Sequence, residues 1–283
     1  MDHSLNRILA VPNWSFFDPN LCLGVRDILS RLPLQIHYVQ GDVDHQRTVT
    51  AFSGQQDVVF DALNSIADHL LPNINMESQR GVHPRVGALD VAPFVLLDGS
   101  ETELISATNS WAADFSTRFE IPVHLYEKSA SPGMEHRLPY LRGQVGHTEQ
   151  LPNFGSLEHP QFGMSIVGVR DFLLATNINL AIGDPKEVRY VAKELRFLRD
   201  HGNPALQGVR ALGFSLKSQG LTQLSLNFTR PDLTSFDAIF EMAKEINDLL
   251  DIFVIETELI GVIRERDLAG ATQLSYDPSQ VVR

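Results

Sequence analysis

A histidine, an arginine and an aspartate lie close together in residues 81–94, a segment rich in proline and glycine. His83 precedes Pro84, which keeps the His83 backbone out of the helical region and limits where its side chain can point. An imidazole, whose ordinary pKa lies near neutrality, suits a general acid or base. The residues alone leave two interpretations open: a catalytic His83, or an ordinary turn in which Arg85 pairs with Asp90.

A second polar cluster occupies residues 41–47, between two predicted strands. Asp42, Asp44, His45 and Arg47 could orient a catalytic histidine, grip a substrate carboxylate or simply form a polar hairpin, since turns favour Asp and Gly. Asp and His also ligate divalent metals. No second cluster with ligand spacing accompanies this one, so we expect no metal.

Two further segments suit the binding of a flat heterocycle. Residues 152–164 place aromatic side chains beside glycines, where a ring can approach the backbone, although inert surface loops have the same composition. Asn177 and Asn179 share one face of a predicted strand because side chains alternate along a strand. Amides both donate and accept hydrogen bonds, as the edge of a heterocycle does.

The elements that must position these residues follow a repeated order. In the first half, period-two and helical patterns predict strand, helix, strand, strand, helix and strand, followed by one more helix and strand. The predicted strands are 7–13, 34–40, 47–53, 91–97 and 121–126, and the predicted helices are 20–31, 55–71 and 102–118. Residues 128–164 show no period and predict an ordered loop region.

The second half predicts the same order again. Its predicted strands are 172–180, 209–216, 221–228 and 252–260, and its predicted helices are 184–199 and 232–249. We therefore expect an α/β (α+β) chain of two ferredoxin-like βαββαβ subdomains, residues 1–172 and 173–283. Two such sheets would face each other across a cleft or tunnel.

Composition argues against several functions. Lys and Arg number 23 and Asp and Glu number 35, which gives a net charge of −12. Such a chain is poorly suited to sequence-independent nucleic-acid binding or to an anionic membrane surface. The single cysteine, Cys22, excludes an intramolecular disulfide and a cysteine-based zinc site. We expect neither nucleic acid nor membrane among the partners.

Common cofactor and targeting signals are absent from the sequence. It contains no phosphate-binding P-loop, no dinucleotide-binding glycine motif after the first strand, and neither the zinc-protease nor the serine-hydrolase motif. We therefore expect no nucleotide cofactor. The first residues lack a signal-peptide core, and no apolar run approaches the ~20 residues of a membrane helix. We expect a cytoplasmic protein.

The sequence resembles the glutamate formiminotransferase (formimidoyltransferase) family, in the form that lacks the cyclodeaminase domain. Several motifs occur in the family's order and together span nearly the whole chain. They are residues 11–15 (VPNWS), 42–49 (DVDHQRTV), 83–91 (HPRVGALDV), 122–127 (PVHLYE), 168–180 (GVRDFLLATNINL) and 258–263 (ELIGVI).

The resemblance implies an activity and the residues that would carry it out. It implies a cytoplasmic homodimer that transfers the formimino group from N-formimino-L-glutamate to N5 of tetrahydrofolate, the acceptor substrate, in histidine degradation and one-carbon metabolism. His83 would be the acid and base in turn, with Asp42 and Asp44 orienting it or holding the amidine. Substrate contacts would come from Arg47, Arg85, Asn13, Asn177 and Asn179. Folate contacts would come from Gly155, Ser156, Leu157, Pro160 and Gly163.

The sequence also departs from the family pattern at several positions. Val82 stands where the family usually has Glu, Gln40 where the animal enzyme has Asp, and Gln46 where the family has Asn. These departures keep two alternatives open. One is a folate-binding homologue that uses another donor, such as formyl-glutamate; the other is a catalytically silent folate-binding or scaffold dimer.

Overall fold

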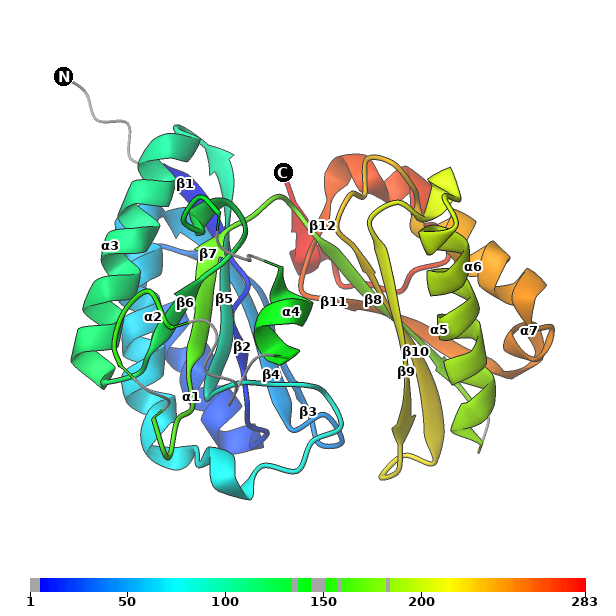
Figure 1. Cartoon of the computed structure of the whole chain (residues 1–283), viewed down its shortest axis with the longest axis horizontal. Coiled ribbons are helices and arrows are strands. Elements are labelled where there is room, and N and C mark those ends of the chain that lie inside the picture. The colour runs from blue at the N-terminus through cyan, green and yellow to red at the C-terminus, as the bar shows by residue number, and fades with distance from the viewer. Residues whose placement is uncertain (1–5, 134–136, 144–150, 157–158, 182–183) are drawn as a thin grey trace. The chain divides into compact units, whose positions relative to one another are not determined.

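The computed structural model describes residues 6–133, 137–143, 151–156, 159–181 and 184–283. The chain divides into two compact units, Met1–Arg170 (unit 1) and Asp171–Arg283 (unit 2) (Figure 1). Each unit combines a β-sheet with helices, so the predicted mixed α/β class is confirmed. In the described part of the chain, no helix combines the length and the apolar character that crossing a membrane requires.

Unit 1 is built on a seven-stranded sheet in the order β3-β4-β1/β2-β5-β7-β6. Its strands are β1 (Arg7–Ala10), β2 (Asn13–Trp14), β3 (Gln35–Asp42), β4 (Arg47–Gln55), β5 (Leu89–Asp98), β6 (Val123–Leu125) and β7 (Ser165–Val169). The strands from β3 to β5 pair antiparallel, and β7 runs parallel to both β5 and β6. With β1 and β2 counted as one interrupted strand, this is the predicted βαββαβ order with an extension beyond β5.

Three long helices cover one face of this sheet: α1 (Pro19–Ser30), α2 (Gln56–Leu70) and α3 (Glu101–Phe119) (Figure 1). The predicted start of α1 is confirmed, because the Asp18 carboxylate accepts the backbone N–H groups of Asn20 and Leu21 and Pro19 occupies the first turn. The buried faces of α2 and α3 pack with Phe52, Phe94 and other strand residues into one apolar core. The long helices therefore leave the opposite face of the sheet uncovered.

A short helix, α4 (Leu138–Gly143), lies on that opposite face. Leu141 packs there with Val86, Val91, Tyr126 and Ile166 in a small apolar cluster. The prediction of a loop over residues 128–164 was therefore wrong at α4. No element was predicted for β7, which lies between that loop and the predicted strand 172–180, because it is too short to show a clear sequence pattern before it is inserted between β5 and β6.

Unit 2 has a four-stranded sheet in the order β11-β8-β10-β9, with every pair antiparallel. Its elements are β8 (Leu174–Leu180), α5 (Pro185–Asp200), β9 (Val209–Leu216), β10 (Leu221–Phe228), α6 (Phe236–Ile246), α7 (Leu249–Phe253) and β11 (Val254–Ile260). In chain order the strands lie 4-1-3-2, which is the ferredoxin-like arrangement. A small parallel pair, β12 (Ile263–Arg264) and β13 (Val281–Val282), follows.

The two faces of the unit 2 sheet differ in polarity. Ile178, Leu180, Leu224 and Leu226 point into the core with α5 and α6, so their neighbours Asn177 and Asn179 point to the other face. One prediction in this unit needs correction at its ends. The expected helix 232–249 begins at Phe236 and stops at Ile246, and α7 occupies the expected start of the last strand.

Candidate functional site

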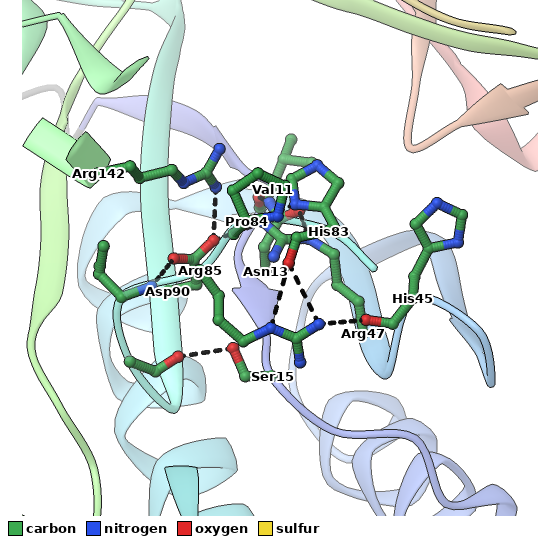
Figure 2. Close-up of polar contacts among 12 residues, drawn as sticks. Val11, Asn13, Ser15, His45, Arg47, His83, Pro84, Arg85, Asp90 and Arg142 are labelled. Carbon is green, nitrogen blue, oxygen red and sulfur yellow. Dashed lines mark hydrogen bonds and ion pairs between the residues drawn. The ribbon is translucent and has the colours of Figure 1, made fainter. Parts of the chain in front are cut away.

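Three strands of unit 1 bring distant polar residues together on the face that α4 covers. Asn13 on β2 pairs with Val49 of β4 and with Val91 of β5, so β2 lies between the two longer strands. Arg47 begins β4 and Asp90 lies near the start of β5. Their side chains therefore meet across β2, although they are far apart in sequence (Figure 2).

A buried ion cluster forms at this meeting point, and we call Arg47, Asp90 and Arg142 the arginine cluster. Arg47 Nη2 donates to Asp90 Oδ2 at 2.6 Å, and Arg142 Nη2 of α4 donates to the same oxygen. Asp90 is fully buried, and its Oδ1 accepts the backbone N–H of Val86 at 2.8 Å. Arg47 Nε donates to Asn13 Oδ1 at 3.0 Å. The hydrogen-bond partners of Asp90 are thus Arg47, Arg142 and Val86, so the interpretation that Arg85 pairs with Asp90 is wrong.

The arginine cluster carries more positive than negative charge. One carboxylate faces two guanidinium groups, and Arg47 Nη1 and Arg142 Nε have no hydrogen-bond partner among the described residues. Burial would raise the pKa of Asp90, but the charges of Arg47 and Arg142 hold it at about 2. Burial lowers the pKa of Arg47 to about 10, against the attraction of Asp90. Buried donors and excess cationic charge are the properties of an anion-binding site.

Arg85 has a different function in the structure. Its Nη2 donates to the His45 carbonyl and its Nη1 to the Gln46 carbonyl at 2.9 Å, while Nε donates to the His83 carbonyl at 3.3 Å. Val82 N–H donates to the Asp44 carbonyl at 3.0 Å. These bonds join the turn after β3 to the loop that carries His83, so the guanidinium group of Arg85 holds protein backbone.

His83 is half-buried, and its ring is oriented by its own loop. Its Nδ1 lies 2.8 Å from the Pro84 carbonyl. A carbonyl only accepts, so Nδ1 carries the proton and the neutral ring has its lone pair on Nε2. Burial and the charges of Arg47 and Arg142 hold the pKa of His83 well below its ordinary value. His83 is thus suited to act as a neutral base.

His45 is a second imidazole at this site, and sequence reasoning did not include it among the site residues. It is buried, and its ring centre lies 6.1 Å from that of His83 (Figure 2). The Asp42 carboxylate, predicted to orient His83 or hold the amidine, accepts from the backbone N–H of His45 at 2.6 Å and from its Nδ1 at 2.8 Å. The signal was present in the sequence as Asp and His three residues apart in one turn.

The predicted folate-binding residues fall into two places. Pro160 and Gly163 lie in a turn beside the His83 loop: Gly163 forms a bridge with Gly87, and a Cβ on Gly163 would stand 2.2 Å from the Val86 carbonyl oxygen. Gly155 and the exposed Ser156 follow Phe154, which bridges to β6 instead. Leu157 lies outside the described residues.

Asn177 and Asn179 lie on unit 2, in a polar network of its own. Asn179 Nδ2 donates to Glu256 at 3.0 Å, and Gln223 Nε2 donates to Asn179 Oδ1 at 2.9 Å. We call Gln223, Asn179 and Glu256 the amide ladder, because they cross three neighbouring strands. Asn177 donates to Glu258 at 3.2 Å. In the described part of the chain, no three His, Cys, Asp or Glu side chains are grouped so as to hold a metal ion.

Comparison with known proteins places the chain in a family. The model named Formiminotransferase domain, N-terminal subdomain, matches residues 20–170, and the model named Formiminotransferase domain matches residues 175–277. The chain belongs to the formiminotransferase domain family. The resemblance found in the sequence motifs is thereby confirmed.

Individual relatives are moderately similar. A glutamate formimidoyltransferase of Thermoplasma acidophilum is 28% identical over 93% of this chain and 90% of its own length. A formimidoyltransferase-cyclodeaminase of Rattus norvegicus is 29% identical over 83% of this chain, and one of Sus scrofa is 32% identical over 80%. The chain spans about half the length of these two: 46% of the rat protein and 44% of the pig protein.

Proposed function

We propose that this protein transfers the formimino group of N-formimino-L-glutamate to N5 of tetrahydrofolate. Family membership and the names of the relatives support transfer of this group. In the reaction, the bond between N5 and the formimino carbon forms and the bond from that carbon to the glutamate nitrogen breaks. One proton leaves N5 and one reaches the departing amine, so the products are 5-formimino-tetrahydrofolate and glutamate.

The arginine cluster is the observation that carries this proposal. N-formimino-L-glutamate has two carboxylates, and Arg47 offers Nη1 while Arg142 offers Nε, both without a partner among the described residues. A carboxylate accepts paired hydrogen bonds from a guanidinium group, and such bonds are stronger than neutral ones. Asp90 keeps both guanidinium groups in place and leaves the cluster with a net positive charge.

His83 takes the role of the base. Its lone pair on Nε2 and its lowered pKa keep it ready to accept the N5 proton as that nitrogen attacks the amidine carbon. The positive charges that lower this pKa are those proposed to hold the donor, so one cluster performs two tasks. Arg85, predicted as a carboxylate clamp, is better placed to position His83 through the backbone. Asn13 positions Arg47 directly, because its Oδ1 accepts from Arg47 Nε.

Tetrahydrofolate is proposed to bind along the turn that holds Pro160 and Gly163, which lies against the His83 loop. Gly155, Ser156 and Leu157 are proposed as further folate contacts on the resemblance to the family. The amide ladder and Asn177 are proposed as hydrogen-bond partners of the substrates, because they present amides and carboxylates on one face of a sheet. A homodimer in the cytoplasm and a role in histidine degradation complete the proposal.

The test is turnover by the purified protein with tetrahydrofolate and N-formimino-L-glutamate. The product is followed by the near-UV absorbance that appears when acid cyclises it. Wild type is compared with His83→Ala and with His201→Ala, an exposed histidine at the end of α5. We expect activity in wild type and His201→Ala and loss in His83→Ala. Turnover with formyl-glutamate alone, or folate binding without turnover, would replace this proposal with the corresponding alternative.

A further inference from the structure

His45 is held in place more firmly than a turn residue requires. The backbone N–H of His45 donates to Asp42 Oδ1, which by itself closes the turn. The ring Nδ1 donates to the same oxygen at 2.8 Å, because an ionised carboxylate only accepts. The second bond fixes the orientation of the ring and leaves Nε2 as the nitrogen that faces away from Asp42. An aspartate that orients a histidine in this way also stabilises its cation.

The backbone of the two histidines is joined as one unit. Gly81 packs so closely that a Cβ would stand 2.0 Å from the His45 carbonyl oxygen, and Arg85 binds that same oxygen. The backbone N–H of Val82 donates to the carbonyl of Asp44, the residue before His45. The spacing between the His45 and His83 rings is therefore supported by backbone contacts together with the guanidinium group of Arg85.

The two imidazoles have opposite electrostatic surroundings. The charges of Arg47 and Arg142 act on His83, and that of Asp90 opposes them. His45 bonds Asp42 on its own turn, its ring neighbours that of His83, and its carbonyl accepts from Arg85 on the adjoining loop. Burial would raise the pKa of Asp42, but the hydrogen bonds from His45 bring it below the ordinary value. Titratable groups whose surroundings differ in this way divide acid and base work between them.

We infer that His45 is a second catalytic residue, an imidazolium supported by Asp42 that protonates the leaving glutamate nitrogen while His83 accepts the proton of N5. This inference rests on the proposed function. The attacking and leaving nitrogens are attached to one carbon, and rings 6.1 Å apart can each lie within hydrogen-bond distance of one of them. The N5–carbon bond forms, the carbon–glutamate nitrogen bond breaks, and each ring returns to its starting protonation state by exchange with water.

The kinetic test is a pH profile of kcat for His45→Gln, His83→Gln and wild type. An acid must be protonated, so loss of His45 removes the decline of kcat at high pH; a base must be neutral, so loss of His83 removes the decline at low pH. We expect each variant to lose about 100-fold or more in kcat. The fold should survive in His45→Gln because the backbone N–H bond to Asp42 remains. A His45→Gln variant within about threefold of wild type in kcat, with both declines present, would overturn the inference.

A second readout does not depend on turnover. In protein labelled with ¹⁵N-histidine, the two rings are assigned by NMR with the same variants. We expect the His45 ring to carry a proton on Nδ1 that is bonded to Asp42, and we expect Asp42→Asn to change the Nδ1 signal of His45 while that of His83 stays as in wild type. A His45 ring whose signals do not respond to Asp42→Asn would overturn the inference. Absence of turnover in wild type would overturn the proposed function, and these signals would still report whether Asp42 orients His45.

Discussion

The arginine cluster of unit 1 and the amide ladder of unit 2 are both polar networks on the side of a sheet away from its long helices, yet they suit opposite ligands. In the arginine cluster, unpartnered donors of Arg47 and Arg142 remain around one carboxylate. In the amide ladder, the chain of hydrogen bonds runs toward Glu256, and Gln223 Oε1 is a buried acceptor without a partner among the described residues. The first arrangement favours an anion, and the second favours a ligand rich in N–H groups.

This difference also predicts how each network contributes to stability. A buried ion pair is strongly destabilised when one partner is removed, because the remaining charge is uncompensated. The amide ladder joins two neutral amides to the exposed carboxylate of Glu256, so a substitution there loses only the hydrogen bonds themselves and the desolvation of the partners left behind. The arginine cluster should therefore tolerate substitution far less than the amide ladder. The predictions below test this contrast, beginning with the largest effect.

The largest effect is expected for Asp90→Asn. The change leaves Arg47 and Arg142 buried against each other without the carboxylate, at a cost of about 3–5 kcal/mol in the free energy of unfolding. Urea denaturation of both proteins measures the difference. Asp98→Asn, an exposed position at the end of the same strand, is the matched control and should change little. Equal stability of Asp90→Asn and Asp98→Asn would show that the Asp90 carboxylate is not needed to compensate the two buried arginine charges.

A smaller effect should appear in the pH dependence of stability. The pKa of Asp90 is held at about 2, below its ordinary 3.8, so its ionisation stabilises the fold above pH 4 and this stabilisation is lost as pH falls toward 2. The contribution amounts to about 2 kcal/mol at neutral pH, and about half should be gone by pH 3. Denaturation at pH 6, 4 and 3 should show the gap between wild type and Asp90→Asn narrowing over this range. A gap that stays constant would contradict the ion-cluster explanation.

Arg47→Lys tests the ligand of the arginine cluster. Lysine keeps the charge but loses the planar pair of donors, so the KM for N-formimino-L-glutamate should rise about 10- to 100-fold. The affinity for tetrahydrofolate, measured by fluorescence titration, should stay within about twofold of wild type, since the cluster is proposed to hold the donor. Arg118→Lys, which changes an exposed arginine paired with Asp68, is the control. If Arg47→Lys weakened tetrahydrofolate binding as much as it raised the KM for the donor, the proposal that the arginine cluster binds the donor would be wrong.

The contrast between the two networks also shows how far the sequence predicts this molecule. The order of strands and helices follows from side-chain periodicity, and the helices predicted over 20–31 and 184–199 begin at Pro19 and Pro185. Asn177 and Asn179 were predicted to share a face for the same reason, because alternation along a strand is a local property. These predictions needed no information from distant parts of the chain.

The arginine cluster shows what local patterns cannot give. The sequence offered Arg85, a neighbour in the chain, as one possible partner of Asp90, whereas the structure pairs Asp90 with Arg47 through the order of strands and with Arg142 through α4. Arg142 lies in a segment without sequence period, and α4 is placed by the packing of Leu141 against residues from three other segments. His45 was visible in its motif, but its distance from His83 depends on backbone contacts between two loops. Tertiary contacts of this kind leave no periodic signal.

The smallest effect is expected in the amide ladder, where Asn179→Ala is compared with Asn177→Ala. Asn179 bonds both Glu256 and Gln223, so its loss should cost about 1–2 kcal/mol in the free energy of unfolding. Asn177 donates one hydrogen bond, to the half-buried Glu258, and its loss should cost less than about 1 kcal/mol. Asn179→Ala should also weaken tetrahydrofolate binding while the KM for the donor stays near that of wild type, the reverse of Arg47→Lys. If Asn179→Ala raised the donor KM instead, the two networks would serve one substrate, and the distinction between an anion site and an N–H-binding site would be wrong.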